Sequence, residues 1–457
     1  MVTEPRIVEV SAAMAVYRVA TMPADDLRLW NARALDPGTG RLVERATIAI
    51  ERGVIVEVAE TSGEMPEGAV DVAGRTVMPG LIDAHTHVSS DVSRSPGFGA
   101  PAHMHGEDPR PRELGWFVLA KTATALLEMG LTSVRDVGAY DDEAIVLRRA
   151  VELEMVTGPR LMSCGRIISA TSPGGRMFGT MYEEADGPWE MRRAVRRQLR
   201  RGADFVKLMS TGARSVERED PRPAQMTREE MAAIVDEAHR IGLRVAAHAE
   251  GLEGTRFAIE QGVDTIEHGM ELHHAPELLT AMAERGQVLV PTLTTFHDLA
   301  ERFAHEWVPR LVDQAKRQLE DAYLTLEAAR AAGVTMAMGF DSGPPGSNAW
   351  ELVRMVEGAL GAPAGLAAAT TGGAAALGRP ELGRLEMGAV GDLIVLDGDP
   401  LADVRLLLRP AAFRLVISGG RAVAGRDLDG PTVGQRPEMV AEVSADGPPS
   451  PCMHGHG

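Results

Sequence analysis

Short apolar runs alternate with helical stretches across residues 79–378, and this alternation constrains the fold more than any other feature of the chain. Eight runs have the length and composition of buried strands: 81–85, 132–137, 160–165, 205–209, 244–249, 265–269, 288–293 and 335–340. The stretches between them carry helix signals, such as Thr227 with Glu230 three residues later, and Gly242 as a stop. Repeated strand–helix units bury a parallel sheet under helices. We therefore predict an α/β protein with a (β/α)8, TIM-like barrel over residues 79–378.

The segments on either side of this region, residues 25–78 and 384–424, have a different pattern. Apolar and polar residues alternate with a period of two, as in 46–50 and 54–58, and turns such as Pro37-Gly38 break the alternation. Short strands from both sides of a barrel suggest one small β-sandwich domain that is discontinuous in sequence. Residues 1–24 and 425–457 are expected to be terminal extensions outside both domains.

The composition narrows the classes of partner. The formal net charge of −18 disfavours nucleic acid and anionic membranes, because both require basic patches. Only Cys164 and Cys452 are present, too few for a disulfide framework or a thiolate zinc site. No apolar stretch approaches the roughly 20 residues of a spanning helix, and Arg18 interrupts the mildly apolar segment 10–20. We expect a cytoplasmic protein that acts on a small molecule.

Metal-competent side chains follow the predicted strands. His85 and His87 stand two residues apart at the end of the first run, and alternate residues of a strand point to one face. Later runs contain or end in four more such residues: Lys207, His248, His268 and Asp341. Because the carboxyl ends of barrel strands meet at one face, we expect these six side chains to converge. Each histidine alone could equally be a core or surface residue, so the prediction rests on their common placement.

These motifs resemble the amidohydrolase superfamily, in particular its members with two metal ions, over about 360 residues from 46 to 420. The likeness lies in the His-x-His after Pro-Gly-Leu-Ile-Asp, the lysine of the fourth strand, two later histidines and a final aspartate. Within the superfamily the chain is most similar to the group of Xaa-Pro dipeptidases, arginine and lysine carboxypeptidases, ochratoxin amidases and imidazolonepropionase-related proteins. The strings 205–209, 265–269 and 290–293 carry this narrower likeness.

The resemblance implies a ligand set for two divalent ions, zinc being the first expectation. His85 and His87 would bind one ion and His248 and His268 the other, with Lys207, as a carbamate formed with CO2, bridging both. Asp341 would bind the first ion and act as general base and acid while a hydroxide bridging the two metals attacks the carbon of an amide. The implied activity is hydrolysis of a non-peptide or dipeptide-like C–N bond, and homo-oligomers are frequent among such relatives.

Other functions remain open from the sequence. Lys207 could be a structural or substrate-binding lysine in a one-metal deaminase or cyclic-amide hydrolase that acts on a heterocycle. The chain could also be a tailoring hydrolase for one specialised metabolite, or a binding protein without catalysis. A buried unpaired ammonium is costly, which favours the two-metal interpretation of Lys207.

Substrate contacts are sought on the loops after the strands, where the chain departs from the nearest group. The Gly-Gly-His-Gly and Ser-Gly-Gly strings of that group are replaced here by 171–176 and 210–214, and Phe296 stands where an aromatic hydroxyl is frequent. Arg176 and Arg214 could each bind a substrate carboxylate through two hydrogen bonds, or could be surface residues. His103 on a long loop and His273 past the sixth strand are further candidates, although His273 could instead open the next helix.

Overall fold

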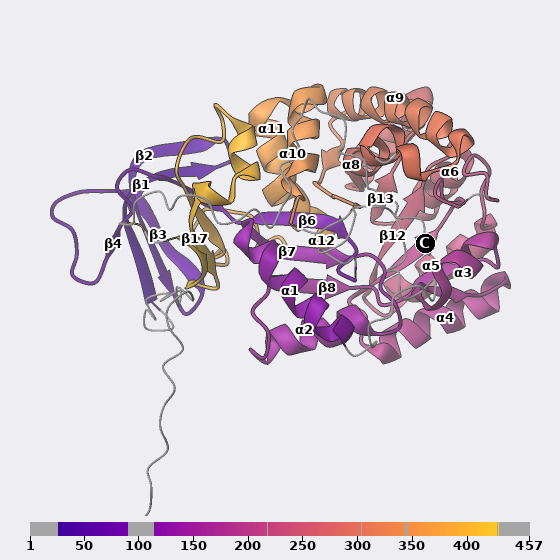
Figure 1. The fold of residues 1–457 in the computed structure, drawn as a ribbon, viewed down its shortest axis with the longest axis horizontal. Helices are drawn as coiled ribbons and strands as arrows, with labels where there is room; N and C mark the ends of the chain where they lie inside the picture. Colours follow the sequence, from indigo (N-terminus) through magenta and orange to yellow (C-terminus); the bar gives the residue numbers. More distant parts are fainter. Residues whose placement is uncertain are drawn as a thin grey trace, which may run out of the picture.

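The computed structural model describes residues 26–89, 114–216, 218–302, 304–342, 346–426 and 428. The segments predicted as terminal extensions, apart from residues 425, 426 and 428, and the candidate substrate contact His103 lie outside these residues. A sheet built from the two flanking segments lies at one end of the molecule, and the parallel strands with their helices form the rest (Figure 1).

Strands from both flanking segments pair in one eight-stranded sheet, in the order β18-β17-β16-β5-β1-β2-β3, with β4 beside β1. The pairing of β16 with β5 joins the two segments, with Val395 opposite Val77. The division of the chain into a sandwich and a barrel domain remains a prediction. The bounds of these strands are β1 Asp26–Asp36, β2 Arg41–Glu51, β3 Val54–Glu60, β4 Val70–Asp71, β5 Thr76–Pro79, β16 Leu393–Leu396, β17 Phe413–Ser418 and β18 Arg421–Gly425.

Each of the eight runs predicted as strands overlaps a strand of the structure. They are β6 Leu81–Thr86, β7 Leu131–Asp136, β8 Arg160–Ser163, β11 Phe205–Met209, β12 Arg244–Ala249, β13 Thr265–His268, β14 Val288–Val290 and β15 Thr335–Met336. Two short strands that the sequence did not indicate, β9 Ile167–Ser169 and β10 Tyr182–Glu184, are added. The pairing in both resulting sheets is parallel, which confirms the α/β class.

The parallel strands form two sheets, β6-β7-β8 and β10-β9-β11-β12-β13-β14-β15, so among the described residues the strand pairing does not form the single closed sheet that was predicted. The reason is visible at both junctions, where isolated backbone hydrogen bonds replace a ladder. The Asp204 amide donates to the Ser163 carbonyl at 2.9 Å. Across the other junction, Ala84 donates to Met338 and Asp341 donates to His85, each at 2.8 Å.

One helix begins and ends where its sequence signals place it. Helix α5, Arg228–Arg240, starts with the complete capping box of Thr227 and Glu230, and Gly242 follows it at φ 79°. Other helices around the parallel strands are α1 Leu114–Glu128, α2 Glu143–Glu152, α3 Pro173–Phe178, α4 Gly187–Arg201, α6 Leu252–Gln261, α7 Pro276–Arg285, α8 Leu293–His297 and α9 Pro309–Ala331.

One helical run among the described residues, Ala349–Leu377, is long and apolar enough by composition to cross a membrane. It comprises α10 Ala349–Met355, η6 Val356–Leu360, α11 Gly361–Ala367, η7 Ala368–Gly372 and α12 Gly373–Leu377. Gly, Pro and Thr residues interrupt its apolar residues between 358 and 377, so it does not stand out as an apolar stretch in the sequence. The run packs on the parallel strands, since the Met338 amide donates to its Ala368 carbonyl at 3.1 Å.

Gly372 provides a test of this packing. A Cβ atom at this position would overlap the carbonyl oxygen of Met336, which is backbone and cannot rotate away. We expect Gly372→Ala to lower the free energy of unfolding by about 1–3 kcal/mol, the usual cost of overpacking a core. Gly115→Ala in α1 is the matched control, because nothing lies within 4 Å of its added Cβ. Urea unfolding followed by circular dichroism should separate the two variants; equal midpoints would contradict the proposed contact.

Candidate metal centre

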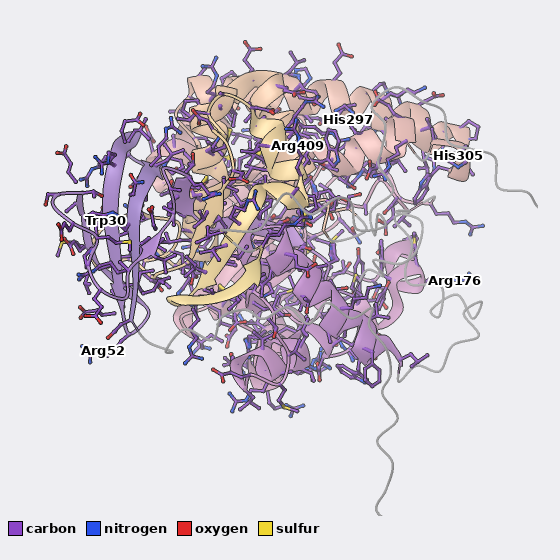
Figure 2. The ribbon with its side chains drawn as sticks, turned by 60° about the vertical axis from the view of Figure 1, so that its left-hand side comes forward. Trp30, Arg52, Arg176, His297, His305 and Arg409 are labelled. Atoms are coloured by element: carbon purple, nitrogen blue, oxygen red, sulfur yellow. The ribbon has the colours of Figure 1, made fainter. Side chains whose placement is uncertain are left out.

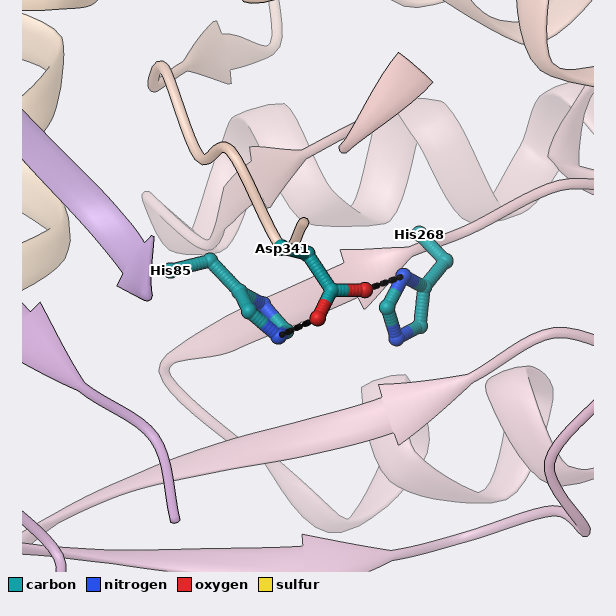
Figure 3. A group of neighbouring side chains, drawn as sticks. All are labelled: His85, His268 and Asp341. Atoms are coloured by element: carbon teal, nitrogen blue, oxygen red, sulfur yellow. Dashed lines mark ion pairs between the residues drawn. The ribbon is translucent and has the colours of Figure 1, made fainter. Parts of the chain in front are cut away.

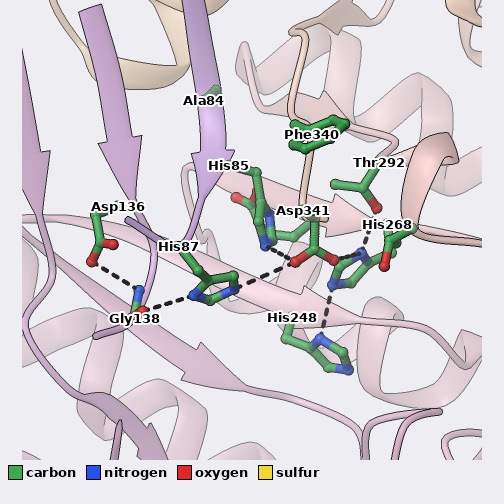
Figure 4. Close-up of polar contacts among 12 residues, drawn as sticks. Ala84, His85, His87, Asp136, Gly138, His248, His268, Thr292, Phe340 and Asp341 are labelled. Atoms are coloured by element: carbon green, nitrogen blue, oxygen red, sulfur yellow. Dashed lines mark hydrogen bonds and ion pairs between the residues drawn. The ribbon is translucent and has the colours of Figure 1, made fainter. Parts of the chain in front are cut away.

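The carboxyl ends of the parallel strands bring five of the six predicted ligands into one set of contacts. His85 lies in β6 and His87 directly after it, His248 and His268 lie near the ends of β12 and β13, and Asp341 follows β15. All five side chains meet on the side of the sheets where the parallel strands end (Figure 4). Their convergence agrees with the sequence expectation about geometry; their role as metal ligands stays a prediction.

Asp341 is the centre of this arrangement (Figure 3). Its Oδ1 lies 3.3 Å from Nε2 of His85 and 3.4 Å from Nε2 of His87. Its Oδ2 lies 3.8 Å from Nδ1 of His268. Ligand atoms of His85, His268 and Asp341 all lie within 4.8 Å of one another. Burial alone would raise the pKa of Asp341, but the neighbouring imidazoles hold it well below its usual range, so the carboxylate is ionised.

The outer nitrogens of the first two histidines are hydrogen-bonded away from the centre. Nδ1 of His85 donates to Glu267 Oε2 at 2.7 Å, and Nδ1 of His87 donates to the carbonyl of Gly138 at 2.7 Å. Nε2 of each ring then faces the Asp341 carboxylate. Burial lowers the pKa of His87, but the hydrogen bond to Asp341 raises it overall, so positive charge between these nitrogens and the carboxylate is stabilised. A metal ion bound at both Nε2 atoms would supply that charge.

His248 and His268 form the second half of the cluster (Figure 4). Nε2 of His268 lies 2.8 Å from Nδ1 of His248, whose Nε2 donates to the carbonyl of Gly212 at 3.1 Å. The hydroxyl of Thr292 lies 2.7 Å from Nδ1 of His268. Burial lowers the pKa of both histidines well below the usual value. The positive charges of Lys207 and Arg214 lower the pKa of His248 further. Both imidazoles are therefore neutral, which is the form that binds metal.

Lys207 lies in the middle of β11 with its side chain buried. Burial lowers its pKa, against the opposing influence of the Glu267 and Asp341 carboxylates. A lowered pKa increases the fraction of neutral amine, and the neutral amine is the form that reacts with CO2 to give a carbamate. An unmodified ammonium has no lone pair for a metal.

A buried ion pair that sequence reasoning missed supports His85. Nη2 of Arg135 donates to Glu267 Oε1 at 2.7 Å, while the other oxygen of Glu267 accepts from His85. Burial opposes ionisation of Glu267, but Arg135 and His85 together lower its pKa to about 2. The signal was present in the sequence, because a charge inside each of two apolar strands requires a buried partner.

The backbone at the site is held in uncommon conformations. His268 has φ 71°, Thr292 φ 50° and Asp341 φ 44°, all in the left-handed region that favours glycine. Beneath His85, a Cβ at Gly339 would lie 2.7 Å from the His85 Cβ, so only glycine lets the segment before Asp341 approach β6. Asp83 fixes the same junction, accepting from the amides of His85 at 2.9 Å and Phe340 at 3.2 Å.

Among the predicted substrate contacts that the structure describes, Arg214 is the one that reaches the cluster of predicted ligands. It is buried, and its Nη2 lies 3.3 Å from Asp341 Oδ2. Its Nη1 donates to Glu250 Oε1 at 2.8 Å, and Nη2 also donates to Thr295 Oγ1 at 2.7 Å. The guanidinium lies over the ring of Phe296, 4.0 Å from its centroid. The side chain is thus held in a fixed orientation at the rim of the cluster.

The other candidates lie elsewhere. Arg176 is exposed on α3 and projects from the outside of the molecule in Figure 2, without a hydrogen bond or ion pair to any described residue. His273 lies in the short helix η3, Leu272–His274, and its ring contacts Thr325 and His274 rather than the predicted ligands. The structure therefore brings neither residue to the cluster.

The residues present fit a metal centre. The donors are four buried or nearly buried imidazoles, of which His248 and His268 are held neutral, an ionised carboxylate and a lysine whose pKa is lowered. Imidazole nitrogens and carboxylate oxygens suit zinc and other first-row divalent ions. Hydrogen bonds from the outer nitrogens of His85 and His87 give the orientation that metal-binding histidines need.

Comparisons with known proteins agree with this chemistry. The family model described as "Amidohydrolase family" matches residues 76–423. Ochratoxinase from Aspergillus niger is 30% identical over 425 residues, which cover 86% of this chain and 85% of the relative. Imidazolonepropionase from Maricaulis maris is 27% identical over 412 residues, covering 83% and 93%. A solved structure of a Xaa-Pro dipeptidase with methionine bound in its active site is 28% identical, has a TM-score of 0.78 and covers 87% of this chain and 99% of that one.

The solved structure of the ochratoxinase is similar as well, with a TM-score of 0.77 over 88% of this chain and 96% of that one. These relatives are hydrolases that act on C–N bonds. The family model matches most of the chain, and the ochratoxinase is 30% identical over 86% of it. Together these two findings assign the family. The chain belongs to the amidohydrolase family and is an enzyme of that class.

Proposed function

We propose that the enzyme hydrolyses the amide bond of a small N-acyl or dipeptide-like molecule in the cytoplasm, using two divalent metal ions, most simply zinc. The ions would be held by His85, His87, His248, His268 and Asp341, with Lys207 as a bridging carbamate, at the face of a (β/α)8 barrel formed by the two parallel sheets together. The observation that carries this proposal is the convergence of Asp341 with His85, His87 and His268 within 3.8 Å.

Two metal ions at this donor set would acidify a shared water molecule and polarise the carbonyl group of the amide. The chain itself supplies the proton transfer. Asp341 is ionised, so it can accept a proton on Oδ2 and return it to the departing nitrogen. Arg214 holds Oδ2 on one side and His268 lies on the other, so this oxygen has a defined direction toward the reacting atoms.

Arg214 would also select the substrate. Nη1 donates to Glu250, Nη2 donates to Thr295 and Asp341, and the guanidinium lies over Phe296, so a substrate carboxylate must take the place of one of these partners. A guanidinium recognises carboxylates through paired hydrogen bonds. We therefore propose that the substrate carries a carboxylate close to the scissile amide, which the ordinary N-acyl amino acids do.

Replacing Asp341 by Asn tests the proton transfer. The amide cannot accept and return a proton as the carboxylate does, so we expect kcat to fall about 10²–10⁴-fold on an N-acyl amino acid. Metal content, measured by plasma mass spectrometry, should remain close to that of the unaltered enzyme. Asp236→Asn is the control, since Asp236 is an exposed partner of Arg192 on the surface. Turnover of Asp341→Asn equal to that of Asp236→Asn would remove the proposed role.

Lys207 provides a test of whether the enzyme binds two metal ions or one. Stripping the enzyme with a chelator and restoring zinc in CO2-free buffer should leave it inactive, and added bicarbonate should restore activity together with two zinc ions per chain. Lys207→Met should lose both the activity and the second ion, because the thioether cannot bridge two cations. Lys121→Met, at an exposed lysine of α1, should behave like the unaltered enzyme. One ion per chain and no response to bicarbonate would favour the one-metal deaminase or cyclic-amide hydrolase instead.

Removing Arg214 tests substrate selection. Because Arg214→Met leaves Glu250 buried without this partner, the variant is made together with Glu250→Gln. We expect KM for an N-acyl amino acid to rise at least about tenfold, that is by about 1.4 kcal/mol or more, while KM for the corresponding neutral amide changes little. Arg176→Met should change neither value. An equal change for both substrates would mean that Arg214 supports the site without recognising a carboxylate.

A further inference from the structure

A second group of metal-competent side chains lies apart from the predicted catalytic ligands. His273 and His274 belong to η3, and Asp321 belongs to α9, which packs beside it. The three residues offer ligand atoms that all lie within 4.8 Å of one another. The centroids of the two imidazole rings lie 3.8 Å apart, and the ring planes are tilted by 42° to one another. None of the three is used in the proposed hydrolysis.

Thr325, one turn after Asp321 on α9, determines which nitrogen of His273 carries the proton. Its hydroxyl donates to the carbonyl of Met270 at 2.6 Å, so its single proton is used there. The same oxygen accepts from the backbone amide of His273 at 3.1 Å and lies 3.1 Å from His273 Nδ1. Nδ1 must therefore donate to it, which leaves the lone pair of a neutral imidazole on Nε2.

That lone pair faces a carboxylate. Nε2 of His273 lies 3.6 Å from Oδ1 of Asp321, which is too long for a hydrogen bond. Two donors bound to one tetrahedral zinc ion at its usual bond lengths lie ~3.3 Å apart. The separation is thus close to that of two ligands of one ion, and a hydrogen bond from Thr325 to the outer nitrogen is the support that metal-binding histidines commonly have.

The surroundings allow an ion to enter. His274 is exposed, and the side chains of His273 and Asp321 retain 13% and 28% of their accessible surface. Three protein donors leave room for water to complete a tetrahedral shell. Two imidazoles with one carboxylate favour zinc over magnesium or calcium, which prefer oxygen donors.

We propose that His273, His274 and Asp321 form a peripheral zinc site, additional to the metals of hydrolysis. The site links the segment after β13 to α9, so bound zinc fastens this helix to the end of the strand that carries His268. Its ligands are separate from those of the catalytic cluster, so the proposal of this site does not depend on the proposed hydrolysis.

Zinc binding to the full chain tests the site directly. The enzyme and the variants His274→Ala and Asp321→Asn are dialysed against the same micromolar free zinc, and bound zinc is counted by plasma mass spectrometry. We expect each variant to bind one zinc ion fewer than the unaltered enzyme. Both substitutions lie at partly or fully exposed positions, and circular dichroism before zinc addition checks that the fold is kept.

Two controls exclude other histidines as the source of the difference. His239→Ala removes a partly exposed histidine of α5 that pairs with Asp264, and should keep the full zinc count. A variant with His454→Ala and His456→Ala, in the C-terminal segment, should keep it too. Equal zinc counts for the unaltered enzyme, His274→Ala and Asp321→Asn would overturn the proposal. Loss of amide turnover in His274→Ala at an unchanged zinc count would likewise overturn it and assign the group to substrate contact.

Discussion

The structure of the site depends on the compensation of two buried carboxylates, Glu267 and Asp341. Arg135 binds one oxygen of Glu267 at 2.7 Å, His85 binds the other at 2.7 Å, and the far nitrogen of His85 lies 3.3 Å from Asp341. Removing one member of such a buried pair typically costs about 3–5 kcal/mol, because the remaining charge has no water around it. Neither carboxylate can therefore be buried without the series of contacts that runs from Arg135 through Glu267 and His85 to Asp341.

The backbone contributes the second condition. The left-handed conformations of His268 and Asp341 each cost of the order of 1–3 kcal/mol, and such strain persists only where the surrounding structure imposes it. At Asp341 the bonds that impose it are the hydrogen bond from the Asp341 amide to the His85 carbonyl and the two amide hydrogen bonds accepted by Asp83. They lie where the two parallel sheets meet. The same hydrogen bonds thus take the place of strand pairing at this junction and fix the backbone of Asp341.

Much of this arrangement could be predicted from the sequence, and the limits have physical reasons. His85, His87, His248, His268 and Asp341 were identifiable because strand ends in a parallel sheet share one edge, so position along the chain fixes position in space. Arg176 and His273 lie on loops, where no periodicity fixes direction; one is exposed and the other turns toward α9. Arg135 and Glu267 were missed because they lie on different strands. Which side chains of two strands meet depends on how the strands are aligned in the fold, and the sequence of a single strand does not reveal that alignment.

The two halves of the site differ in how freely they can change. The predicted histidine and aspartate ligands lie on the parallel strands or follow them, and buried polar contacts connect them, so a substitution there disturbs several charges at once. Arg214 stands on a loop, and its partner Glu250 is held from the other side by Gln318 of α9 at 2.7 Å. This second buried pair touches the first at two points, where Arg214 lies 3.3 Å from Asp341 Oδ2 and Glu250 lies 3.4 Å from His248 Nε2. Exchanging both of its members together removes one buried cation and one buried anion, so recognition of the substrate can change at an unchanged buried net charge.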